Sequence, residues 1–118
     1  VKRPFSSTGE TISRPLTKQE CRSLQKTYGN YVKVTVDIAK QILVAGCELH
    51  ADGEKILLES GSFQDNIWGG GINSITKEID ATAVLNLRPK LQNNSLEVLD
   101  PQRRQKLIEI IEKIFKNL

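Results

Sequence analysis

The sequence is poor in the residues that build most metal and redox sites. Its 118 residues include one histidine and two cysteines, and Cys21 and Cys47 lack the close spacing of a zinc motif. No apolar run approaches the roughly 20 residues of a membrane-spanning helix, and residues 1–14 lack the apolar stretch of a signal peptide. We therefore expect a cytoplasmic protein with free cysteines and no membrane partner.

The composition is that of one folded domain with an uneven charge distribution. Only four prolines and 38% hydrophobic residues exclude disordered and fibrous chains. Residues 1–33 carry seven Lys and Arg against two Glu, residues 34–86 three Lys against eight acidic residues, and residues 87–118 seven basic residues against four acidic ones. The basic ends would bind nucleic acid weakly if they gathered on one face, but solvated surface is the simpler interpretation.

The first third of the chain predicts an arm followed by a helix. Residues 1–14 show no periodic apolar pattern, so we expect a flexible N-terminal arm before a single domain over residues 15–118. Thr17 and Glu20 form a capping box, in which each side chain satisfies a free backbone donor of the first helical turn. Gly29 predicts the end of this helix.

The next segments predict a hairpin and then an ambiguous turn. Residues 31–38 alternate between apolar and polar side chains, which is typical of a half-buried strand. Residues 42–49 are an apolar run of the kind found in strands covered on both faces. Asp52-Gly53 suits a tight hairpin turn, whereas residues 54–60 suit a short helix with His50 or Asp52 near its start. We favour the helix.

The last third predicts two further strands and a closing helix. Residues 66–73 read as a strand whose glycines allow a bulge or a close approach by another group, and residues 79–87 alternate as a strand does. Asp100 as the N-cap and Pro101 at the first position predict a helix. Its apolar face consists of six large residues: Leu107, Ile108, Ile111, Ile114, Phe115 and Leu118.

These elements together predict an α+β fold. It would contain an antiparallel sheet of about four strands, arranged as two hairpins, with the N-terminal and C-terminal helices packed on one face. The short helix, if formed, would lie between the hairpins. The apolar stripe of the closing helix must be covered, either by this sheet or in a homodimer formed through the sheet or the helix.

The only histidine lies between two carboxylates just after the predicted central strand. Glu48 and His50 are two residues apart and would point the same way in an extended segment, so they could form an acid and base pair. Glu48, His50 and Asp52 are also the candidate ligands of a divalent metal, although a zinc site normally has three or four ligands that include further His or Cys. The simpler interpretation is a structural turn.

Later polar residues supply candidate ligand contacts. Trp68 beside three glycines would make a stacking platform if exposed, or a core residue if buried. Arg88 ends a predicted strand, and its guanidinium could hold a carboxylate or phosphate or tie down its own loop. Asn86 and Ser95 complete the candidate ligand-binding set.

Several short motifs in this order resemble a known family. They are Glu48-Leu49-His50-Ala51-Asp52, Trp68-Gly69-Gly70, Asn86-Leu87-Arg88-Pro89, Asn94-Ser95 and Asp100-Pro101. Over residues 12–117 the chain resembles a small bacterial, notably cyanobacterial, family, the domain-of-unknown-function family 5674. It departs from the family pattern at Cys47 and Asn94, where the family has Gly and Arg. The resemblance implies no activity.

Two functions remain open. We favour a non-enzymatic binding or regulatory module for a small ligand or a protein partner. The alternative is a small hydrolase or nuclease-like enzyme in which Glu48, His50 and Asp52 act, with a divalent metal in one version, while Arg88 stabilises an anion. We expect no cofactor in the first case and a divalent metal at most in the second.

Overall fold

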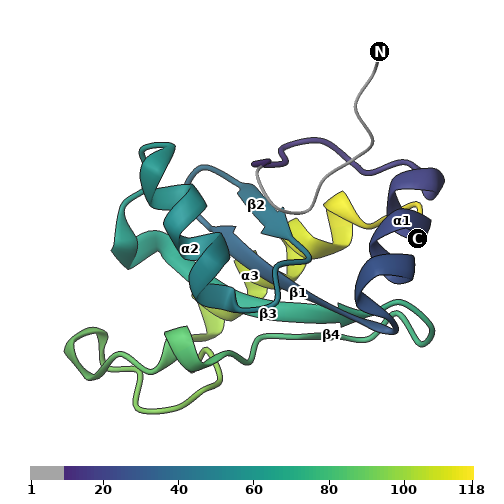
Figure 1. The fold of residues 1–118 in the computed structure, drawn as a ribbon. Helices are drawn as coiled ribbons and strands as arrows, with labels where there is room; N and C mark the ends of the chain where they lie inside the picture. Colours follow the sequence, from purple (N-terminus) through teal and green to yellow (C-terminus); the bar gives the residue numbers. More distant parts are fainter. Residues whose placement is uncertain (1–9) are drawn as a thin grey trace.

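The fold is built on one antiparallel sheet (Figure 1). The structure is a computed structural model, and it describes residues 10–118. The strands are β1 (Tyr31–Asp37), β2 (Ile42–Ala45), β3 (Ile67–Asn73) and β4 (Ile79–Asp80). They lie in the sheet in the order β2-β1-β3-β4. The helices are α1 (Lys18–Tyr28), α2 (His50–Glu59) and α3 (Pro101–Ile114). The predicted α+β fold with two hairpins and a helix between them is confirmed.

The helices cover opposite faces of the sheet. Alternate residues of β1, among them Val34 and Val36, face a core that also contains the buried residues of α1 and α3. On the other face, α2 packs its Leu57 against Val44 of β2 and Ile67 of β3. Figure 1 shows α2 on one side of the sheet and α3 on the other. The prediction that the terminal helices share one face is therefore confirmed.

The helix starts follow the predicted capping chemistry. Thr17 Oγ1 accepts a hydrogen bond from Glu20 N at 3.1 Å, and Glu20 Oε1 accepts one from Thr17 N at 2.9 Å. Asp100 Oδ2 accepts from Arg103 N at 2.8 Å. The apolar stripe of α3 is buried within the chain, and it includes Ile110, which the predicted stripe omitted. This stripe therefore needs no second chain to cover it.

Two predicted strands are shorter than expected. Residues 42–49 form a strand only as far as Ala45, because Gly46 turns the backbone with a φ of +85°. The prediction of a strand over residues 79–87 is wrong beyond Asp80. There the Asp80 carboxylate accepts from Thr82 N at 3.1 Å, and Thr82 pairs with Glu97 instead of with β3.

The segment after β4 is a long loop with single 3₁₀ turns. One of them, η2 (Val84–Asn86), replaces the end of the predicted strand. The alternation over these residues correctly indicated buried side chains, since Ala81 and Ala83 are buried. It did not indicate which strand or loop would form hydrogen bonds with this segment.

The predicted N-terminal arm is described only in part. Residues 1–9 of the arm lie outside the described residues. Ile12 is buried and forms an antiparallel bridge to Leu43 at the edge of the sheet, with N···O distances of 2.7 and 3.0 Å. Within residues 10–118 there is no helix of the length and apolarity that crossing a bilayer requires.

Candidate functional site

The glycines of β3 make room for two aromatic rings. A Cβ at Gly69 would lie 2.9 Å from Cδ2 of His50, and a Cβ at Gly71 would overlap the ring of Tyr31. Both rings lie on the face of the sheet that α2 covers in part, because Tyr31 and Gly71 belong to the same alternating set as Thr35 and Gly69. Of the two predictions for this glycine strand, a bulge or a close approach, the close approach is confirmed, and the approaching groups include Ala83 and His50 at Gly69 and Tyr31 at Gly71.

His50 is the first residue of α2 and is held by the backbone of β3. Its Nε2 lies 2.7 Å from Gly70 O. A carbonyl only accepts, so Nε2 carries the proton and Nδ1 keeps a lone pair. Burial lowers the pKa of His50, and the positive charge of Lys33 adds to this, while the Gly70 carbonyl and Asp80 act in the opposite direction. The ring is therefore neutral at pH 7 and presents Nδ1 as an acceptor.

Tyr31 and Asp80 form a second fixed pair beside His50. The Tyr31 hydroxyl donates to Asp80 Oδ2 at 2.8 Å. Burial raises the pKa of Tyr31, and the hydrogen bond to Asp80 raises it further, so the phenol stays protonated. The second oxygen of Asp80 accepts from Thr82 N. The carboxylate is thus anchored at both oxygens.

Lys33 completes the cluster with a positive charge. It lies on β1 directly opposite Gly71, and Asp80 lies opposite Gly71 on the other side, in β4. Lys33, His50 and Asp80 are partly exposed. Within residues 10–118, the Lys33 ammonium makes no ion pair or hydrogen bond. Side chains of both charge signs therefore surround a strand position that has no side chain.

The predicted ligand contact Arg88 is engaged elsewhere. Its Nη1 donates to Gln64 O at 2.9 Å, and its Nη2 forms an ion pair with Glu54 Oε2 at 3.3 Å. The guanidinium also lies 4.8 Å from the ring centroid of Trp68, and that of Arg103 lies at 4.7 Å. Arg88 therefore ties the loop after β4 to α2 and to Trp68.

Trp68 is a core residue. Its side chain is 0% exposed, and its Nε1 donates to Asp65 O at 3.0 Å. The stacking platform considered for Trp68 would need an exposed ring, which is absent here. The two guanidinium groups cover the tryptophan at the edge of the core.

Asn86 acts as a buried clamp on β3. Its Oδ1 accepts from Gly69 N at 2.8 Å, and its Nδ2 donates to Gly69 O and to Leu96 O, both at 2.9 Å. Asn93 has the same role within the loop, where its Nδ2 donates to Asn86 O at 2.7 Å. Ser95 Oγ accepts from Glu97 N. These polar groups hold the loop and position the Gly69 backbone beneath His50.

The predicted carboxylate partners do not gather around His50. Glu48 is exposed, and Asp52 Oδ2 accepts from Leu49 N at 3.3 Å at the start of α2. Across the described part of the chain, no three His, Cys, Asp or Glu side chains are arranged to hold a metal ion. The structure thus places Glu48, His50 and Asp52 in one turn without assembling them into a metal site.

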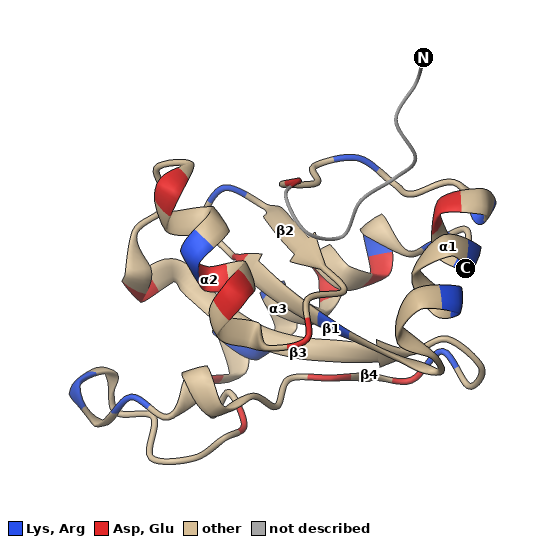
Figure 2. Ribbon diagram, in the orientation of Figure 1, with Lys and Arg blue, Asp and Glu red and all other residues tan. Residues whose placement is uncertain are grey.

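Sequence reasoning missed Tyr31, Lys33 and Asp80. The sequence did contain signals for these residues. Tyr31 and Lys33 share the polar face of a predicted strand, and the glycines indicate a close approach by another group. What was missing was the register, which brings Asp80 beside residues almost 50 positions earlier. Figure 2 shows acidic residues on α2, on the loop that leads into it and on β4, and it shows residues of both charge signs on α1, α2 and α3.

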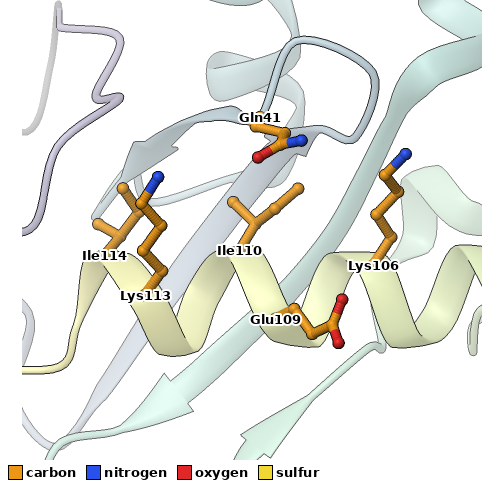
Figure 3. Close-up of a pocket in the computed structure, with 6 residues that line it drawn as sticks. All are labelled: Gln41, Lys106, Glu109, Ile110, Lys113 and Ile114. Carbon is orange, nitrogen blue, oxygen red and sulfur yellow. The ribbon is translucent and has the colours of Figure 1, made fainter.

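The described hollows lie along α3, away from this cluster. One of them has a volume of about 150 Å³, and in it Ile110 lies between Lys106 and Lys113 on α3, with Gln41 on the other side (Figure 3). It is lined by Gln41, Lys106, Glu109, Ile110, Lys113 and Ile114. Another, of about 210 Å³, includes Ile72 and Phe115. Both are shallow surface features beside the helix that packs on the opposite face of the sheet.

Comparison with known proteins gives a family but no activity. No curated protein and no solved structure matches the chain. A family model matches residues 10–114, which include every element of the sheet and every residue of the His50 cluster. The chain therefore belongs to the family described as protein of unknown function (DUF5674).

Proposed function

We propose that this protein is a non-enzymatic binding module that takes a small polar ligand on the face of the sheet beside α2. One observation carries the proposal: Tyr31, Lys33, His50 and Asp80 converge around Gly69–Gly71 of β3. These side chains come from β1, α2 and β4, and each is partly exposed. A few convergent polar groups on a rigid scaffold are typical of a ligand site.

The organisation of the cluster favours binding over catalysis. The bonds of His50 to Gly70 and of Tyr31 to Asp80 fix the groups before any ligand arrives, which reduces the entropy lost on binding. The hydrolase considered from the sequence would use Arg88 beside His50 to stabilise negative charge. Arg88 is instead paired with Glu54.

The test is a ligand screen on the full chain, read out by amide NMR shifts. The panel would contain amino acids, amines, carboxylates, nucleotides, sugars and inorganic phosphate. We expect at least one compound to shift the amides of Gly69–Gly71, and His50→Asn to weaken that binding. Lys26→Ala, at an exposed position of α1, is the matched control. If no compound shifts these amides at millimolar concentration, the proposal fails.

A second candidate function is self-association through the loop after β4. Four large aliphatic side chains there are 43–76% exposed: Val84, Leu87, Leu96 and Leu99. The hydrogen bonds of Asn86 and Asn93 hold this loop in place. These four aliphatic side chains are therefore exposed on an ordered loop. Large exposed apolar groups on an ordered loop are typical of a protein contact.

Sedimentation velocity would test this second candidate. We expect mass to rise with protein concentration in the wild type and to stay monomeric in Leu87→Ser with Leu99→Ser. Ile75→Ser, an exposed aliphatic residue in the β3–β4 turn, is the control. A wild type that is monomeric at every concentration would rule out self-association.

A further inference from the structure

The two charges of the cluster lie on one face of the sheet and are kept apart. Lys33 and Asp80 both pair with Gly71, one from each side. Neighbouring strands are about 4.8 Å apart, so the two Cα atoms are separated by roughly 10 Å. No ion pair joins the two side chains within 4.0 Å among the described residues. The cluster is therefore a dipole with its positive end on β1 and its negative end on β4.

A flat apolar surface lies between these charges. The ring of Tyr31 lies over Gly71, since a Cβ there would overlap it, and the side chain remains 40% exposed. Its hydroxyl donates to Asp80 and so points to the negative end. An aromatic face next to a carboxylate is a favourable place for a small ammonium group, because the ring quadrupole and the carboxylate both attract a cation.

The donors and acceptors are also divided between the two ends. The Lys33 ammonium offers three donors, none of them used within the described residues. Asp80 has further lone pairs beyond those that Tyr31 and Thr82 use, and His50 Nδ1 adds a neutral acceptor. A simple anion would be repelled by Asp80, and a simple amine by Lys33. A molecule with both charges meets attraction at both ends.

We propose that the ligand is a small zwitterion of the free amino-acid class, with its ammonium group on Asp80 and Tyr31 and its carboxylate on Lys33. The inference rests on the proposed binding function and specifies its ligand. His50 contributes an acceptor and limits the size of the site next to Ala83, which packs against the same glycine. Recognition of this kind depends on both charges of the ligand at once.

The experiment compares three ligands in which the charged groups are attached to the same two-carbon unit. The full chain is titrated with alanine, with ethylamine, which lacks the carboxylate, and with propionate, which lacks the ammonium, while the Gly71 amide shift is followed. Other amino acids follow, to find the side chain that binds best. We expect the zwitterion to bind at least about tenfold more tightly than either analogue, since each loses one charged contact.

Variants then locate the two ends of the ligand. Lys33→Met and Asp80→Asn should each weaken zwitterion binding about tenfold or more, and asparagine keeps an oxygen for the Tyr31 hydroxyl. Lys55→Met and Glu59→Gln, both exposed on α2, are the matched controls and should bind as the wild type does. An unchanged amide spectrum away from β3 confirms that each variant is folded.

The outcomes separate this inference from the function on which it rests. If zwitterions bind no better than their analogues while another compound shifts Gly69–Gly71, the ligand class is wrong and the binding function stands. If nothing shifts these amides, both fail. If zwitterions bind but Lys33→Met and Asp80→Asn keep full affinity, the assigned site is wrong.

Discussion

Replacing Asn86 by alanine should be among the most destabilising single changes in this protein. The side chain is 0% exposed and connects β3 to the loop that follows β4. It makes three hydrogen bonds of 2.8–2.9 Å, two with the Gly69 backbone and one with Leu96 O, and a longer one of 3.3 Å to Ala81 O. Alanine removes all four and leaves Gly69 N–H buried without an acceptor.

The magnitude follows from these bonds. The two short bonds that Nδ2 donates contribute about 1 kcal/mol net each, and the buried Gly69 N–H that loses its acceptor costs about 1–3 kcal/mol. We therefore expect Asn86→Ala to lower the free energy of unfolding by roughly 4 kcal/mol, a large part of the roughly 5–15 kcal/mol typical of a small domain. Because Gly69 lies beneath His50, the change should also loosen the candidate ligand site.

Urea denaturation measures this loss directly. We expect a lower midpoint with an unchanged slope, and faster hydrogen exchange at the Gly69 amide. Asn94→Ala is the control, since Asn94 is exposed in the same loop and its side chain makes no hydrogen bond within the described residues. A loss below about 1 kcal/mol for Asn86→Ala would refute the reasoning, because the four bonds would then contribute almost nothing net.

Three further changes test other contacts. Burial lowers the folded-state pKa of His50 below 6.5, so below about pH 6.5 the unfolded chain takes up a proton before the folded one does, and the free energy of unfolding should fall. The urea midpoint of His50→Asn should not show this fall with pH. Gly71→Ala should displace the Tyr31 ring and cost about 1–3 kcal/mol, and it should cost far less in a Tyr31→Ala background if this overlap is the cause. The bidentate contact with Arg14 lowers the pKa of Glu20 to about 2, so stability should be lost as the pH falls from about 4.5 towards 2. If Glu20→Gln loses as much stability over this pH range as the wild type does, the prediction is wrong.

The predictable parts of the fold are those with local causes. The capping box of Thr17 and Glu20 and the Asp100-Pro101 start of α3 each satisfy backbone donors within one helical turn, so they act the same in any tertiary context. The alternation over residues 31–38 likewise identified β1. The strand predicted over residues 79–87 was wrong beyond Asp80, because alternation reports which side chains are buried and not which strand is the partner.

The candidate site shows the same division more sharply. The sequence by itself determined that the middle of the chain is acidic, favoured a helix with His50 or Asp52 near its start, and allowed a bulge or a close neighbour at the glycines of β3. Only the tertiary structure decided that these neighbours include His50 and Tyr31, that Arg88 pairs with Glu54, and that Lys33 and Asp80 flank Gly71. The physical reason is that local patterns arise from bonds within a few residues, whereas a site of opposite charges depends on strand register, which is set by the packing of the whole sheet.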